Sequence, residues 1–254
     1  MTRTLLIRGM LVGLLAGVLA FGIARVLGEG PLSAGITFET ATEPTGAPTA
    51  PELVSRTVQS TAGLATGTLV FAVALGGLFG LVYALAQGRL GSLSTRGTAL
   101  LVAAGGFLAL YLLPAVKYPP NPPGTSNATT ITDRTQWYGV MLFISVVVVV
   151  AGTVLARWLS ARLGAWNAAL LAAFGGLVVI VVAYAVLPVI DETPKGFAGN
   201  VLWQFRVAST AIQLTVWTTL GLVFGALTER QFRTHNMHTT TPVPRSTSTR
   251  ASPP

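Results

Sequence analysis

The stretch Leu112-Leu113-Pro114-Ala115-Val116-Lys117-Tyr118-Pro119-Pro120-Asn121-Pro122-Pro123-Gly124 lies between two long apolar runs, and Asp133-Arg134-Thr135 follows it just before the second run. Its prolines lack a backbone donor and fix φ, so the stretch predicts a stiff turn between two helices. Weaker copies of this pattern lie at residues 28–56 and 187–206. We therefore predict three helical hairpins, each turning at one of these loops.

The composition is that of a membrane protein. Of the 254 residues, 52% are hydrophobic and only 9% are charged, whereas a soluble domain carries about 25% charged residues. The chain contains no cysteine, which excludes disulfides, thiolate metal sites and cysteine nucleophiles.

Six apolar runs are long enough to cross a bilayer as helices, and none alternates as a barrel strand would. We therefore predict an all-α bundle with six spans, at about residues 5–27, 62–86, 98–116, 137–158, 166–187 and 207–227. Residues 1–230 form this transmembrane domain. Residues 231–254 are rich in Thr, Ser, Pro and Arg, which is typical of a disordered tail, here expected on the cytoplasmic side.

The charges predict the orientation of this bundle in the plasma membrane. With both termini in the cytoplasm, the inner segments hold ten basic residues and one acid, and the outer segments hold six basic residues and seven acids. Basic residues favour the cytoplasmic side, so the predicted topology is N-in and C-in.

One alternative concerns the N-terminus. Residues 1–28 could be a cleaved signal peptide, with Arg3 and Arg8 as its basic region. The glycines at 9, 13 and 17 instead form a repeated GxxxG pattern, which favours a retained span that packs on a neighbouring helix.

Three arginines recur at related places: Arg56, Arg134 and Arg206 each open the second helix of a predicted hairpin, 78 and 72 residues apart. A cation there opposes both the helix dipole and the orientation bias, so each calls for a specific partner. Arg25 and Glu29 can pair at a spacing of one helical turn. These arginines either hold loops to helix ends through ion pairs or line a polar outer vestibule.

The sequence indicates no enzyme, because it has no phosphate-binding loop and no histidine in any span. Outer carboxylates are the candidate cation ligands, namely Glu29, Glu39, Asp191 and Glu192. Ordinary solvated loop acids are the alternative interpretation. Polar residues of the last span could line a pathway or serve as contacts between helices: Gln213, Thr215, Thr218 and Thr219.

Several spaced motifs resemble the CbtA family of proposed cobalt transporters over nearly the whole chain apart from the tail. They are Arg8-Gly9-Met10, Phe21–Glu29, Ile36–Glu39, Leu113-Pro114 with Lys117–Pro119 and Asn121–Pro123, Gly196-Phe197 with Leu202-Trp203 and Phe205–Ser209, and Gly221–Arg230. The resemblance implies a multi-pass membrane subunit that takes up cobalt(II) as its substrate and holds no permanent cofactor. It also implies a small histidine-bearing membrane partner, CbtB, which would supply the histidine missing from these spans.

The expected function is therefore that of the membrane subunit of a cobalt uptake system. Glu29, Glu39, Asp191 and Glu192 would capture the cation, with Arg25, Arg56, Arg134 and Arg206 as their charge partners. The alternative is a scaffold subunit that stabilises a partner complex without transporting ions.

Overall fold

The computed structural model describes residues 2–42, 54–91, 93–125, 130–190 and 192–231, and within these residues every regular element is helical. The predicted C-terminal tail and Asp191 lie outside the described residues.

The elements join into long continuous helices. The first comprises α1 (Thr2–Ile23), η1 (Ala24–Gly28) and α2 (Glu29–Thr42); the second, α3 (Arg56–Val58), η2 (Gln59–Gly63) and α4 (Leu64–Ala86); the third, α5 (Thr95–Phe107), η3 (Leu108–Leu112) and α6 (Leu113–Lys117); the fourth, α7 (Ile131–Val186); and the last, α8 (Gly199–Thr219) with η4 (Leu220–Phe224). Each η segment is a single π-helical stretch.

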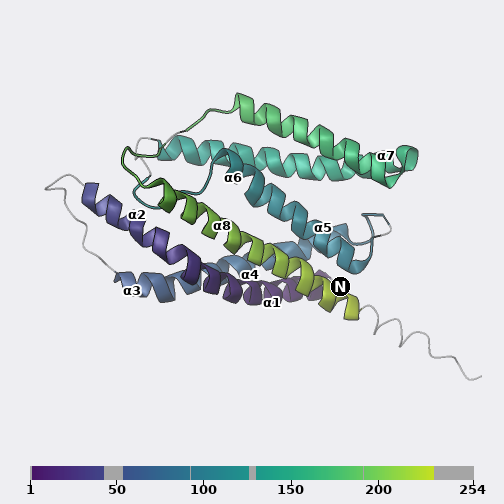
Figure 1. Cartoon of the computed structure of the whole chain (residues 1–254). Helices are drawn as coiled ribbons and strands as arrows, with labels where there is room; N and C mark the ends of the chain where they lie inside the picture. Colours follow the sequence, from purple (N-terminus) through teal and green to yellow (C-terminus); the bar gives the residue numbers. More distant parts are fainter. Residues whose placement is uncertain (1, 43–53, 92, 126–129, 191, 232–254) are drawn as a thin grey trace, which may run out of the picture.

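Five of these continuous helices are long and apolar enough to cross a membrane. The fourth, α7, contains the predicted span 137–158 and all but the last residue of the predicted span 166–187. It has helical geometry except at Gly164, where φ is 76° and ψ is 158°. Only glycine adopts this backbone readily. The chain folds back there, so that α7 forms a hairpin of two arms (Figure 1).

Two predicted features are wrong in detail. The first loop was expected over residues 28–56, with the first span ending at residue 27, but the helix continues to Thr42. The π-helical segment η1 ends at Gly28, three residues before Pro31, and its wider i→i+5 hydrogen bonding reduces the clash of a proline ring with the preceding turn. Arg206 was expected to open its helix, but it is the eighth residue of α8, which starts at Gly199.

The ends of the helices gather at two ends of the bundle (Figure 1). The start of α1, the α4–α5 connection, the Gly164 turn and the end of α8 lie together at one end, here called the N-terminal end. The other end carries α2, α3, α6, the two ends of the α7 hairpin and the start of α8, and we call it the proline-loop end.

Glycines set the closest helix contact, between α1 and α4. A Cβ at Gly9 would lie 2.1 Å from the carbonyl oxygen of Gly76, and one at Gly13 would lie 2.3 Å from that of Ala72. The repeated GxxxG pattern is therefore confirmed as a packing face, and α1 is an integral part of the bundle. By contrast, Gly67 of α4 has open space around it.

The contact of α5 with α8 is built on a second set of small residues. A Cβ at Gly106 would lie 2.2 Å from the indole ring of Trp217, and one at Gly221 would lie 2.9 Å from Ala103. The Phe224 ring packs edge-on against Phe79 at 5.2 Å between centroids, which joins α8 to α4.

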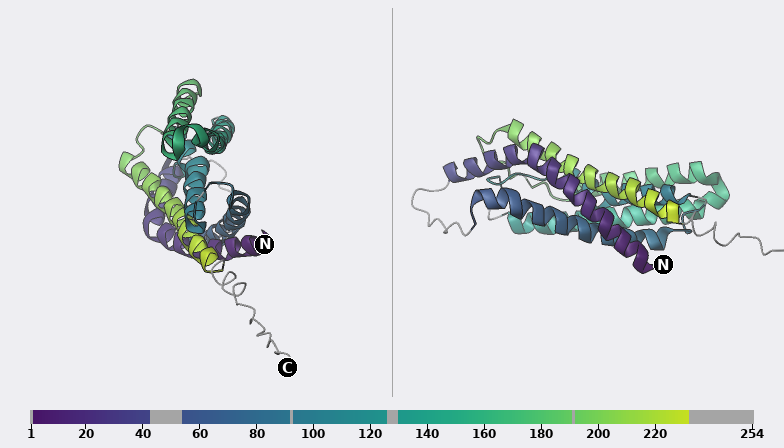
Figure 2. Two further views of the ribbon diagram at one scale, coloured as in Figure 1. Left: turned by 90° about the vertical axis from the view of Figure 1, so that its right-hand side faces the viewer. Right: turned by 90° about the horizontal axis from the view of Figure 1, so that it is seen from below.

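The α7 hairpin lies to one side of the other helices (Figures 1 and 2). Most of its large apolar side chains are exposed. An open groove of about 550 Å³ follows its first arm between Val146 and Trp158, and its lining is apolar throughout. In a bilayer such a surface meets lipid or the helix of a partner.

Candidate functional site

The proline-rich loop is fastened to the end of the α7 hairpin. Lys117 donates hydrogen bonds to the carbonyl oxygens of Tyr184 (2.8 Å) and Leu187 (2.9 Å), where the last carbonyls of a helix favour a cation. The hydroxyl of Tyr118 donates to the carbonyl oxygen of Pro188 at 2.9 Å. Burial raises the pKa of Tyr118, so it remains a donor.

The same loop enters the bundle instead of covering its surface. Pro122 and Thr125 are fully buried. A Cβ at Gly35 of α2 would lie 2.7 Å from the carbonyl oxygen of Pro123, and Gly124 has a φ of 78°, which favours glycine. The loop is thus packed against α2 without room for larger residues.

Two of the repeated arginines also form hydrogen bonds to this loop. Arg134 at the start of α7 donates to the carbonyl oxygen of Pro119 at 2.7 Å. Arg206 of α8 donates to the side-chain oxygen of Asn121 at 2.9 Å. The Nε atom of Arg206 is buried and has no hydrogen-bond partner among the described residues. The loop therefore closes the proline-loop end through contacts with three helices.

Arg134 also forms the most buried ion pair of the proline-loop end. Its guanidinium lies 2.5 Å from the carboxylate of Glu192, which is only 2% exposed. Thr130 donates to the other oxygen of Glu192 at 2.7 Å. Glu192 therefore ties the segment after α7 back to the start of α7.

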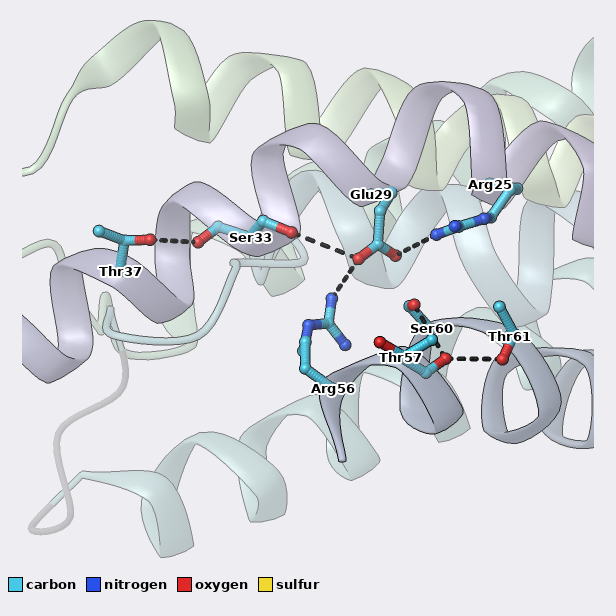
Figure 3. Close-up of polar contacts among 8 residues, drawn as sticks. All are labelled: Arg25, Glu29, Ser33, Thr37, Arg56, Thr57, Ser60 and Thr61. Atoms are coloured by element: carbon cyan, nitrogen blue, oxygen red, sulfur yellow. Dashed lines mark hydrogen bonds and ion pairs between the residues drawn. The ribbon is translucent and has the colours of Figure 1, made fainter. Parts of the chain in front are cut away.

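Glu29 is the centre of a second polar cluster, which joins α2 to α3 (Figure 3). Arg56 lies 2.5 Å from one carboxylate oxygen, and Ser33 donates to that oxygen at 3.3 Å. Arg25 lies 3.6 Å from the other oxygen, which confirms the predicted i,i+4 pair. One carboxylate thus balances two guanidinium groups.

The N-terminal end has its own polar contacts, which sequence reasoning missed. Arg8 of α1 donates to Thr228 at 3.1 Å and also to Gln231. Arg96 at the start of α5 forms an ion pair with Glu229. The signal was present in the motifs Arg8-Gly9-Met10 and Thr228-Glu229-Arg230. Their contact could not be predicted without knowing that the starts of α1 and α5 lie beside the end of the last helix.

A family model described as "Probable cobalt transporter subunit (CbtA)" matches residues 2–229. The chain belongs to the CbtA family. No curated protein and no solved structure matches it. The match extends over all the described helices, including both ends of the bundle, and this CbtA protein is a multi-pass membrane protein of a cobalt transporter subunit family.

The four candidate carboxylates of this CbtA protein lie in different settings. Glu29 and Glu192 hold arginines, whereas Glu39 near the end of α2 is exposed and lies beside Gly124. Asp191 is outside the described residues. Among the residues that the structure describes, no group of three or more His, Cys, Asp or Glu side chains comes together.

The four polar residues expected along the last CbtA span also differ from one another. Thr215 and Thr219 donate to carbonyl oxygens of their own helix, at 2.8 and 2.7 Å. Thr218 is exposed on the outside of the bundle, and Gln213 is half-buried. Gln213 shares its face of α8 with two residues that sequence reasoning did not select, Thr210 and Trp217, at spacings of three and four residues.

Proposed function

We propose that this CbtA protein is the membrane subunit of a cobalt(II) uptake system and crosses the membrane six times. The family match over residues 2–229 carries this proposal. The two arms of α7 on either side of Gly164 account for the sixth span. Both ends of the described chain, at Thr2 and Gln231, belong to the same end of the bundle (Figure 1), as an even number of spans requires.

The orientation in this proposal places the proline-loop end outside the cell. The N-terminal end carries Arg3, Arg8, Arg89 and Arg96, and the Gly164 turn is flanked by arginines as well. Such an excess of basic residues favours the cytoplasmic side. The proline-loop end carries most of the acids, which raises the local concentration of cations outside.

Within this proposal the four candidate carboxylates have two different roles. Glu29 and Glu192 act as anchors for arginines, because a cation would have to displace a guanidinium group at 2.5 Å to reach either one. Glu39 is exposed and available to a hydrated cation. Asp191 has the right chemistry for the same role. These carboxylates therefore attract the cation electrostatically and raise its local concentration without binding it tightly.

The proposal includes a small histidine-bearing membrane partner. The family description as a subunit supports a partner. No histidine lies in the described residues, and no group of three potential ligands forms there. A borderline transition metal such as cobalt(II) prefers imidazole ligands, so a partner with a histidine would complete the chemistry that these helices lack.

Uptake of radioactive cobalt(II) by cells tests the proposal directly. We expect cells that express the chain with its partner to accumulate cobalt faster than cells with the partner alone. Glu39→Gln is expected to raise the KM for cobalt(II) about two- to threefold at low ionic strength, with little change in the maximal rate, because only the attraction of the outer face is reduced. The matched control is Thr40→Val, a neighbouring exposed change that removes no charge.

Equal uptake with and without the chain would overturn the transport proposal. It would favour the scaffold function, for which the exposed α7 hairpin offers an apolar surface. A scaffold would co-purify stably with the partner and would leave the rate of cobalt entry unchanged when Glu39 is replaced.

A further inference from the structure

A polar stripe on α8 leads from the proline-rich loop into the middle of the bundle. Arg206, Thr210, Gln213 and Trp217 follow one another at spacings of four, three and four residues, so their side chains lie on one narrow face of the helix. We call these four residues the polar file. Two of its members fix the direction of that face: Thr210 and the Tyr111 hydroxyl are 2.9 Å apart, and Trp217 packs on Gly106.

The polar file therefore faces η3 and α5, away from the exposed face of α8 that carries Leu214 and Thr218. Polar groups inside a membrane bundle are costly unless they bond to one another or meet water. The Tyr111–Thr210 pair satisfies one pair of hydroxyls. The remaining groups need another explanation.

Two buried donors of the file have no acceptor among the described residues, the Nε of Arg206 and the Nε1 of Trp217. Trp217 is only 6% exposed. A buried indole N–H without a partner is destabilising. The half-buried side-chain amide of Gln213 lies between them and adds donors and an acceptor, so the face has the chemistry of a hydrated path.

We infer that the polar file is a solute path along α8, closed at its outer mouth by Asn121 of the proline-rich loop and at its inner end by the ring of Trp217. The Asn121–Arg206 hydrogen bond is the outer contact. The ring of Trp217 fills the space over Gly106, where a Cβ would approach to 2.2 Å. Opening requires that the loop leave Arg206 and that the indole leave Gly106.

The charge of the file selects what enters it. The guanidinium of Arg206 pairs with no carboxylate among the described residues, and its hydrogen bond there goes to the neutral side chain of Asn121. A bare divalent cation at this mouth meets uncompensated repulsion. The path thus takes water and acceptor-bearing solutes that are neutral or negatively charged. Resting on the proposed function, this means that cobalt(II) gathered at the outer face by Glu39 enters the file only in a complex whose ligands cancel its charge.

The natural lack of cysteine allows a direct test, since one introduced cysteine is then the only thiol. Gln213→Cys places the thiol in the file, and Leu214→Cys places it on the exposed apolar face of the same turn. The purified full chain in sealed vesicles is treated with membrane-impermeant methanethiosulfonates, one carrying a sulfonate and one a trimethylammonium group. Circular dichroism and elution volume establish that both variants are folded.

We expect the thiol at 213 to react at least about tenfold faster than that at 214, because an apolar environment raises the thiol pKa and each unit lowers the thiolate fraction tenfold. The sulfonate reagent is expected to react faster at 213 than the trimethylammonium reagent, and Arg206→Gln should reduce this preference. Equal rates at 213 and 214 from both sides of the vesicle would overturn the path. A preference for the cationic reagent would overturn its charge selection.

The labelling experiment and the cobalt uptake experiment can fail independently of each other. Labelling of the thiol at 213 in a chain that shows no cobalt uptake would support the path and remove the transport proposal. Cobalt uptake with an unreactive thiol at 213 would retain the transport proposal and remove this path.

Discussion

Replacing Gly76 by alanine is expected to lower the free energy of unfolding by about 2–3 kcal/mol, because added volume in a well-packed core forces the helices apart. The Cβ of the new residue would lie 2.2 Å from the carbonyl oxygen of Gly9 and 2.8 Å from the Cα of Gly13. Both are backbone atoms of α1, so no side-chain rotation relieves the contact. Reversible denaturation of the detergent-solubilised chain measures the change.

Gly67→Ala is the matched control on the same continuous helix. Gly67 has nothing within 4 Å of an added Cβ, so alanine there should be neutral or slightly stabilising through helix propensity, by up to about 1 kcal/mol. Equal effects of the two substitutions would show that α1 and α4 do not approach as closely as described.

The contrast between these glycines shows what the sequence could predict about packing. The spacing of Gly9, Gly13 and Gly17 identifies a packing face on α1, and the structure confirms it against α4. The same spacing at Gly63 and Gly67 predicts a contact that does not form. Spacing reports which residues share a face, but whether another helix passes that face depends on the whole bundle.

The helix that extends furthest beyond its predicted span contains a π-helical segment. Gly28–Pro31 carries strong turn residues, yet the chain remains helical from Thr2 to Thr42. The segment η1 accommodates Pro31, as η3 does Pro114. Such a segment depends on local hydrogen-bond rearrangement under tertiary packing, which composition does not encode. Gly164, in contrast, folds α7 between the two apolar runs that were predicted as separate spans.

The sequence predicted which charged residues belong to the site, but it did not predict which residues they contact. The sequence indicated that Arg56, Arg134 and Arg206 each require a partner, and each has one. It could not assign Glu192 to Arg134 across 58 residues or Asn121 to Arg206 across 85. The sequence also indicated Thr215 and Thr219 of α8 as pathway residues. Both hydroxyls are bonded to carbonyl oxygens of their own helix, and the sequence alone does not distinguish such a hydroxyl from a free one.

Glu192→Gln is expected to lower the free energy of unfolding by about 3 kcal/mol, near the lower end of the cost of breaking a buried ion pair. The carboxylate is 2% exposed and its partner Arg134 is 21% exposed, so water screens the remaining cation only partly. Loss of the pair also loosens the hydrogen bond of Arg134 to Pro119 and with it the proline-rich loop. Thermal denaturation and protease sensitivity of the loop measure these effects.

Glu39→Gln makes the same chemical change on an exposed carboxylate of the same end of the bundle, and its effect on stability should stay within about 0.5 kcal/mol. The double variant of Glu192→Gln with Arg134→Gln should be more stable than the sum of the two single changes predicts, since removing both charges leaves neither uncompensated. If Glu192→Gln instead leaves stability unchanged and slows cobalt uptake, Glu192 is free to meet the cation and its role as an anchor is wrong. Comparing Glu192→Gln with Glu39→Gln therefore distinguishes a carboxylate that stabilises the fold from one that attracts the substrate.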